Sequence, residues 1–110
     1  MTGPEATIEK YLKTRIEAIG GMCIKWTSPG FRGVPDRIVI YPSVGVVFVE
    51  LKSPTGKLSD RQKRVKNMLA KAGALVFSLN GTDGVDEFVD FITGTDDVDI
   101  EDLSNLPRVH

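Results

Sequence analysis

Two acidic residues and a lysine stand at the ends of two apolar runs, in an order that could build a phosphodiesterase site. Asp36 opens the run 38–41, and Glu50 and Lys52 close the run 46–49. Two neighbouring carboxylates repel each other, and a hard cation such as Mg²⁺ relieves that repulsion because it prefers oxygen ligands. An ammonium group beside them can orient a water molecule or neutralise charge that develops on a phosphate. The pattern therefore predicts metal-dependent hydrolysis of phosphodiester bonds.

A hairpin would bring these three side chains together. Residues 42–45, Pro-Ser-Val-Gly, are typical of a tight connection between two strands. In the simplest antiparallel register Asp36 lies opposite Glu50, with β-carbons roughly 5 Å apart. Lys52 shares a face with Glu50 because side chains alternate along a strand. The same register pairs the apolar residues directly: Ile38 with Phe48 and Ile40 with Val46.

The remaining elements must hold this hairpin in place. Apolar spacing predicts a helix over 4–19, a second helix from the N-cap Ser59 to Gly73, and a third that starts at Asp83. Strands are expected over 22–27 and 74–79. On the second helix four residues are expected to point inward: Val65, Met68, Leu69 and Ala72. The hairpin strands are apolar on both faces, which is typical of a sheet covered on both sides. We therefore expect an α/β fold, a three-layer αβα domain around a central mixed sheet.

The charge of the chain is unevenly distributed. Residues 1–73 hold 13 Lys and Arg against 6 Asp and Glu, whereas residues 74–110 hold one arginine against nine acids. A basic body around the predicted site suits a polyanionic substrate. We expect one domain over 1–93 and an acidic C-terminal tail over 94–110. That tail could be solvated, bind a partner, or cover the basic surface of a second copy.

Composition excludes several other classes of protein. No apolar run approaches the length of a membrane span, and the first residues lack the pattern of a signal peptide. Cys23 is the only cysteine, so no internal disulfide can form, and its apolar neighbours indicate a small core residue. We expect a cytoplasmic protein.

The chain resembles the VRR-NUC family of the PD-(D/E)xK nuclease superfamily in three stretches: GVPDR at 33–37, FVELK at 48–52 and LSDRQ at 58–62. The resemblance extends over about residues 5–80. It implies a restriction-endonuclease-like fold, a Mg²⁺ or Mn²⁺ cofactor, and Asp36, Glu50 and Lys52 as catalytic residues. The backbone carbonyl of Leu51 is implied as a further metal ligand.

Members of the superfamily often add a glutamate from the first helix, and two candidates compete. Glu9 lies eleven residues before Gly20, as in similar resolvase helices, and neighbours the inward Leu12. Glu5 lies closer to the centre of the apolar stripe but sits in the first turn, where a carboxylate also favours the helix dipole. Glu9 is the preferred metal ligand, with Glu5 as the alternative.

Gln62 also has two interpretations. With Ser59 it completes a capping box, a sufficient structural role. The resemblance adds a supporting role in the active site, because the side chain can reach the sheet.

Basic and loop residues around the site are candidates for phosphate contacts. The seven predicted DNA-binding residues are Lys25, Ser28, Arg32, Arg37, Lys57, Arg61 and Arg64. Phe31, on the glycine-rich loop, could wedge at a junction or pack at a dimer contact.

Similarity to Holliday-junction resolvases implies a homodimeric endonuclease that cuts branched DNA, since two symmetric incisions suit a two-fold dimer. A nuclease for flaps, nicks or linear duplex is one alternative. A DNA-binding or partner-binding module without catalysis is another, against which the intact Asp36, Glu50 and Lys52 argue.

Overall fold

Four strands form one mixed sheet in the order β1-β2-β3-β4 in the computed structural model, which describes residues 4–95. The first three strands pair antiparallel, and β4 lies parallel to β3. Their bounds are Met22–Lys25 for β1, Arg37–Tyr41 for β2, Gly45–Lys52 for β3 and Leu75–Asn80 for β4. The helices are α1 at Pro4–Ala18, α2 at Asp60–Lys71 and α3 at Gly81–Gly94. All predicted elements are present, in the predicted order.

The hairpin of β2 and β3 has the predicted register. Ile38 pairs with Phe48 and Ile40 with Val46. Asp36 lies one residue before the paired part of β2, where its carbonyl oxygen accepts a hydrogen bond from the Trp26 amide at 3.0 Å. The predicted strand over 22–27 ends at Lys25, and this single bond continues its contact with the hairpin.

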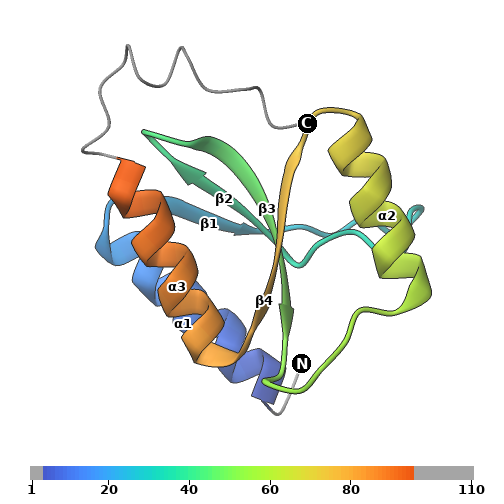
Figure 1. Ribbon diagram of the computed structural model, residues 1–110, viewed down its shortest axis with the longest axis horizontal. Helices are drawn as coiled ribbons and strands as arrows, with labels where there is room; N and C mark the ends of the chain where they lie inside the picture. The colour runs from blue at the N-terminus through green and yellow to red at the C-terminus, as the bar shows by residue number, and fades with distance from the viewer. Residues whose placement is uncertain (1–3, 96–110) are drawn as a thin grey trace.

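Helices α1 and α3 cover one face of the sheet, and α2 lies on the other face (Figure 1). Three alternate residues of β3, Val47, Val49 and Leu51, point toward α1 and α3 and are buried. Helix α3 begins at Gly81, two residues before the predicted Asp83, and buries four apolar residues: Val85, Phe88, Val89 and Ile92. This arrangement is the predicted α/β fold, a mixed sheet with helices on both faces. No helix within residues 4–95 combines the length and apolar character that a membrane crossing needs.

The face that carries α2 is covered unevenly. The capping box forms, and Val65 is buried as expected. The prediction for Met68 is wrong, because its side chain is 55% exposed. Helix α2 packs mainly against β4, and Met68, almost one turn after Val65, lines an open cleft between α2 and the loop that precedes β2. On β1 and β3 three apolar residues on this face are also exposed: Met22, Ile24 and Val46.

The predicted acidic tail begins where α3 ends. Residues 96–110 lie outside the described residues, so the expectations for the tail stay predictions.

Candidate active site

Asp36 and Glu50 lie together at the end of the hairpin. Asp36 Oδ2 accepts a hydrogen bond from the Leu51 amide at 2.8 Å, which holds its carboxylate beside the strand residue that follows Glu50. Glu50 is buried. The pKa of Glu50 is raised to about 8. Burial is the largest cause, followed by the charge of Asp36 and a hydrogen bond between the two carboxyl groups. Glu50 therefore holds a proton near neutral pH when no cation is present.

Lys52 stands two residues after Glu50 on β3, so the two side chains share a face of the sheet. Its positive charge opposes the effect of burial and of Asp36 on the pKa of Glu50. Lys52 therefore acts electrostatically on the carboxyl pair, as the predicted site requires.

Gln62 forms the capping box and also contacts Glu50, one with each end of its side-chain amide. Its Oε1 accepts a hydrogen bond from the Ser59 backbone amide at 2.9 Å, and Ser59 Oγ accepts one from the Gln62 amide at 3.1 Å. Its Nε2 donates to Glu50 Oε1 at 3.0 Å. The capping box thus aims the amide group at the site and couples the start of α2 to β3.

Glu9 has partners other than Asp36 and Glu50, and its role as a metal ligand stays a prediction. Glu9 Oε1 accepts from Arg37 Nε at 2.7 Å and from Lys25 Nζ at 3.0 Å. Arg37 pairs directly with the buried Val49 and shares its face, so it points toward α1, whereas Glu50 points toward α2. Glu9 is a buried structural acid with two cationic partners.

Glu5 is the acid of α1 that acts on the site. Its charge contributes, after burial and Asp36, to the raised pKa of Glu50. It is half-buried in the first turn of α1. The spacing from Gly20 and the inward neighbour Leu12 favoured Glu9 over Glu5, but in the structure Glu9 pairs with Arg37 and Lys25.

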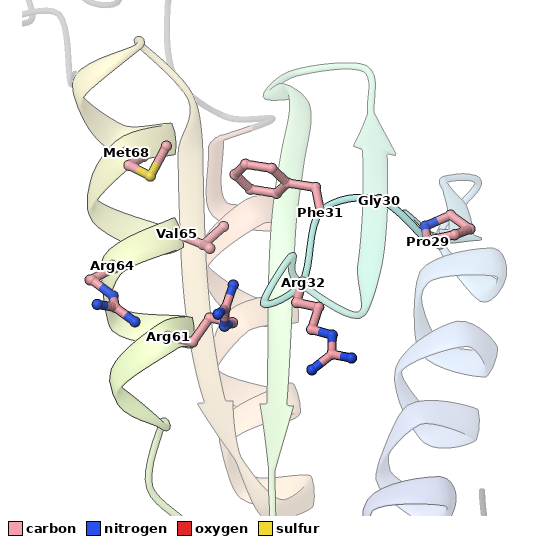
Figure 2. A pocket seen from close by; sticks show the side chains of 8 residues that line it. All are labelled: Pro29, Gly30, Phe31, Arg32, Arg61, Arg64, Val65 and Met68. Atoms are coloured by element: carbon pink, nitrogen blue, oxygen red, sulfur yellow. The ribbon is translucent and has the colours of Figure 1, made fainter.

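Five of the seven predicted DNA-binding residues fall into two groups. Lys25 and Arg37 both pair with Glu9, whose single carboxylate compensates one of their two positive charges. Arg32, Arg61 and Arg64 line a cleft between α2 and the loop that precedes β2 (Figure 2).

The last two predicted DNA contacts, Ser28 and Lys57, lie outside that cleft. Ser28 accepts a hydrogen bond from the Phe31 amide through its carbonyl at 3.0 Å and so shapes the loop. Lys57 is exposed in the segment between β3 and α2.

The donor set fits a hard divalent cation in part. Within residues 4–95 no group of three or more His, Cys, Asp or Glu side chains is arranged to hold a metal ion. Asp36 and Glu50 supply two carboxylates, and Mg²⁺ commonly binds one or two carboxylates and keeps waters at its other positions. The buried, repelling carboxyl pair is the environment that such an ion would stabilise. The Leu51 carbonyl ligand stays a prediction.

Asn80 supports the site in a way that the sequence pattern did not indicate. Its side-chain amide donates to the carbonyls of Ser53 at 2.9 Å and of Gly56 at 2.8 Å. Because Asn80 pairs with Lys52 across the parallel strands, these bonds fix the chain just after Lys52. From the sequence, Asn80-Gly81 predicts only a turn. No local pattern indicates that Asn80 binds the Ser53 and Gly56 carbonyls, which lie 27 and 24 residues earlier in the chain.

Cys23 takes no part in this site. Burial raises the pKa of its thiol to about 11, so it is a protonated core residue, as its apolar neighbours indicate.

Comparisons with known proteins agree with this geometry. The chain is 42% identical over 79 residues to a protein of Acyrthosiphon pisum secondary endosymbiont phage 1 named "Putative nuclease p44", a match that covers 72% of this chain and 85% of the phage protein. A solved structure described as a VRR_NUC domain matches with a TM-score of 0.74 and 35% identity, over 81% of this chain and 97% of that one. The family model for the VRR-NUC domain matches residues 8–83, which include Asp36, Glu50, Lys52 and Gln62. The chain belongs to the VRR-NUC domain family.

Proposed function

We propose that this protein is a metal-dependent endonuclease that hydrolyses phosphodiester bonds in branched DNA. The observation that carries the proposal is the contact between Asp36 and the buried Glu50 at the end of the hairpin, with Gln62 bound to Glu50. Such a carboxyl pair is costly in a folded protein unless a proton or a cation compensates it. Membership in a family named for nucleases and similarity to a phage protein of that name support the same activity.

Asp36, Glu50 and the Leu51 carbonyl would hold Mg²⁺ or Mn²⁺, with Glu5 near enough to add its charge. Such an ion, when bound, polarises a phosphoryl oxygen and lowers the pKa of a bound water. The hydrogen bond from the Leu51 amide fixes one carboxylate, and the Gln62 amide fixes the other, so neither side chain must reorganise.

Lys52 is the cation of the proposed mechanism. It lies on the face that carries Glu50 and affects its pKa. An ammonium in this position orients the attacking water or stabilises negative charge that develops on the phosphate. The arginines of the nearby cleft, including Arg61 next to Gln62, hold the DNA strand by its phosphates.

The preferred substrate is a four-way junction, which a homodimer would cut symmetrically. An exposed apolar face supports pairing with a second copy. Met22, Ile40 and Val46 form one row across β1, β2 and β3, and Ile24, Ile38 and Phe48 form the next row on the same face. Exposed apolar patches of this kind mark interaction surfaces.

A direct test incubates the purified protein with a synthetic four-way junction, with and without Mg²⁺ or Mn²⁺. We expect paired incisions that require the metal. The Asp36→Ala variant should lose cleavage by at least about a hundredfold, as expected for a catalytic ligand, while junction binding in chelator stays measurable. Equal cutting by the two proteins would show that the site is assigned wrongly.

The substrate preference needs a second comparison, because the site itself fits any DNA phosphodiester. Junction, flap, nicked duplex and linear duplex of matched sequence are incubated with the same enzyme and metal. Faster cleavage of the junction is expected. Equal rates on all four substrates would remove the junction assignment and leave a general endonuclease.

A further inference from the structure

The cleft between α2 and the loop before β2 has a volume of about 600 Å³, within the range of ligand-binding pockets, roughly 300–1,000 Å³. It lies beside the site, since Arg61 in its wall precedes Gln62, which binds Glu50. The shape and chemistry of its lining therefore point to a more specific ligand.

The walls of the cleft are fixed by close contact between the loop and the helix. Gly33 has a φ of +89°, and a β-carbon at this position would lie 2.8 Å from Arg61 Cγ and 3.0 Å from Val65 Cγ2. Only glycine permits this approach, because any side chain would collide with α2. The cleft is consequently part of the folded structure and does not depend on a ligand to form.

The two ends of the cleft differ in chemistry (Figure 2). Phe31 and Met68 lie at one end, and both remain exposed, by 46% and 55%. Arg32 and Arg61 lie at the other end, toward the part of β3 that carries Glu50. Within residues 4–95, no carboxylate pairs with Arg32, Arg61 or Arg64. An aromatic ring at one end and free guanidinium groups at the other match a base and its phosphate.

We propose that this cleft binds one unpaired nucleotide of the DNA strand, with its base stacked on Phe31 against Met68 and its phosphate held by Arg32 and Arg61. In duplex DNA both faces of a base are covered by its neighbours, so only an unpaired or extruded base can reach Phe31. The enzyme would then cut beside unpaired nucleotides, such as those of a flap or of an opened pair at a branch point. The inference rests on the proposed function and names the feature of the substrate that the site selects.

A second copy of the chain is the competing occupant, since Phe31 and Met68 are apolar. Charge argues against it. The three guanidinium groups beside these residues have no acidic partner among residues 4–95. Across a two-fold contact they would face an equally basic surface, and like charges at an interface are unfavourable. A nucleotide brings the negative charge that the arginines lack.

The test measures binding of wild-type protein to single-stranded DNA in excess chelator, so that no cleavage occurs. An abasic site is moved one nucleotide at a time along the strand. We expect one position at which loss of the base weakens binding about tenfold, within the range of one base–aromatic stack. Phe31→Ala should cause the same loss with the intact strand, and the combination should cause no further loss.

Two matched variants control for general effects. Phe91→Ala removes an equally exposed phenylalanine on α3 and should leave binding unchanged. Arg61→Ala should reduce the dependence of binding on salt by roughly one phosphate contact, whereas Lys63→Ala, on α2 but outside the cleft, should not.

The proposal is overturned if no abasic position distinguishes wild type from Phe31→Ala. It is also overturned if Phe31→Ala converts a dimer to a monomer in sedimentation, because Phe31 would then bind a second copy. Absence of metal-dependent cleavage would refute the endonuclease and leave this binding result standing. The two failures are therefore distinguishable.

Discussion

The buried carboxyl of Glu50 has more influence on the site than any other single group. Its neighbours are a second carboxylate, an amide donor and a lysine, and its elevated pKa reflects burial first and the charge of Asp36 second. Glu9 is equally buried yet has the opposite surroundings, two cations that hold its charge. Two buried acids in one small domain thus have different surroundings: Glu9 contacts two cations of the chain, and Glu50 is proposed to bind a cation from outside.

The stability of the metal-free protein should depend on pH through Glu50. The folded protein holds a proton up to a pKa of about 8, whereas the unfolded chain loses it near 4.5. The folded state therefore binds more protons between these values, and the free energy of unfolding should fall as the pH rises from about 4.5 to about 8. Thermal unfolding in chelator should show this slope in wild type and a smaller one in Glu50→Gln. Identical slopes in wild type and Glu50→Gln would show that Glu50 does not hold this proton in the folded protein.

The affinity for a metal ion should also depend on Glu50, but it should rise with pH where the stability falls. A cation competes with the proton of Glu50, so Mn²⁺ binding, measured by calorimetry, should strengthen as the pH rises through the same interval. Glu50→Gln should bind Mn²⁺ far more weakly at every pH. Affinity that does not change with pH would place the cation elsewhere.

Glu9 should matter for folding and not for metal binding. Glu9→Ala leaves Arg37 buried without its partner, and we expect the free energy of unfolding to fall by about 2 kcal/mol, less than for a fully buried pair because Lys25 is 52% exposed. Glu17→Ala, which breaks an exposed pair with Lys13 on the same helix, should cost less than about 0.5 kcal/mol. Strong loss of Mn²⁺ affinity in Glu9→Ala, with stability intact, would restore Glu9 as a ligand.

Among the secondary-structure elements, the start of α2 and the end of β3 act as one unit. The capping box orders the first turn of α2, and the Gln62 side chain that completes it also binds Glu50. Asn80 of β4 holds the chain that connects these elements. The position of the site therefore depends on three elements that are separate in the sequence and joined by side-chain amides.

Two substitutions in the capping box should have separable effects. Ser59→Ala removes the cap bond and should lower the free energy of unfolding by about 1 kcal/mol, with little change in Mn²⁺ affinity. Gln62→Ala should cause a similar loss of stability and should also weaken Mn²⁺ binding, because it leaves Glu50 without its donor. Calorimetry and denaturant unfolding of both variants provide the measurement. Equal Mn²⁺ affinity in the two variants would reduce Gln62 to a capping residue.

At the scale of the whole molecule, the two faces of the sheet are unequal. Helices α1 and α3 cover one face, on which Val39, Val47 and Val49 are almost fully buried. On the other face α2 lies over β4 and leaves the apolar rows of β1 to β3 partly open (Figure 1). Catalysis is proposed at one end of this open face and subunit pairing at the other.

Charges on the open rows should prevent subunit pairing. Ile24→Lys and Val46→Lys place ammonium groups on exposed apolar positions, and sedimentation should then show a monomer where the wild type is a dimer. The monomer should make a single incision in a four-way junction, and not two symmetric incisions, because each subunit supplies one active site. Phe91→Lys, on the opposite side of the sheet, is the control. A wild-type protein that sediments as a monomer would contradict the homodimer.

Local patterns in the sequence determine the elements, the hairpin register and the capping box, because alternation, helical spacing and turn chemistry involve neighbouring residues. They also determine which carboxylates meet, since Asp36 and Glu50 are related by that register. Contacts between distant elements decide three other points: the pairing of Glu9 with Arg37, the exposure of Met68 and the role of Asn80. Only the tertiary structure decided these points, because which face of the sheet a helix covers, and where along it, is set by packing that no local pattern records.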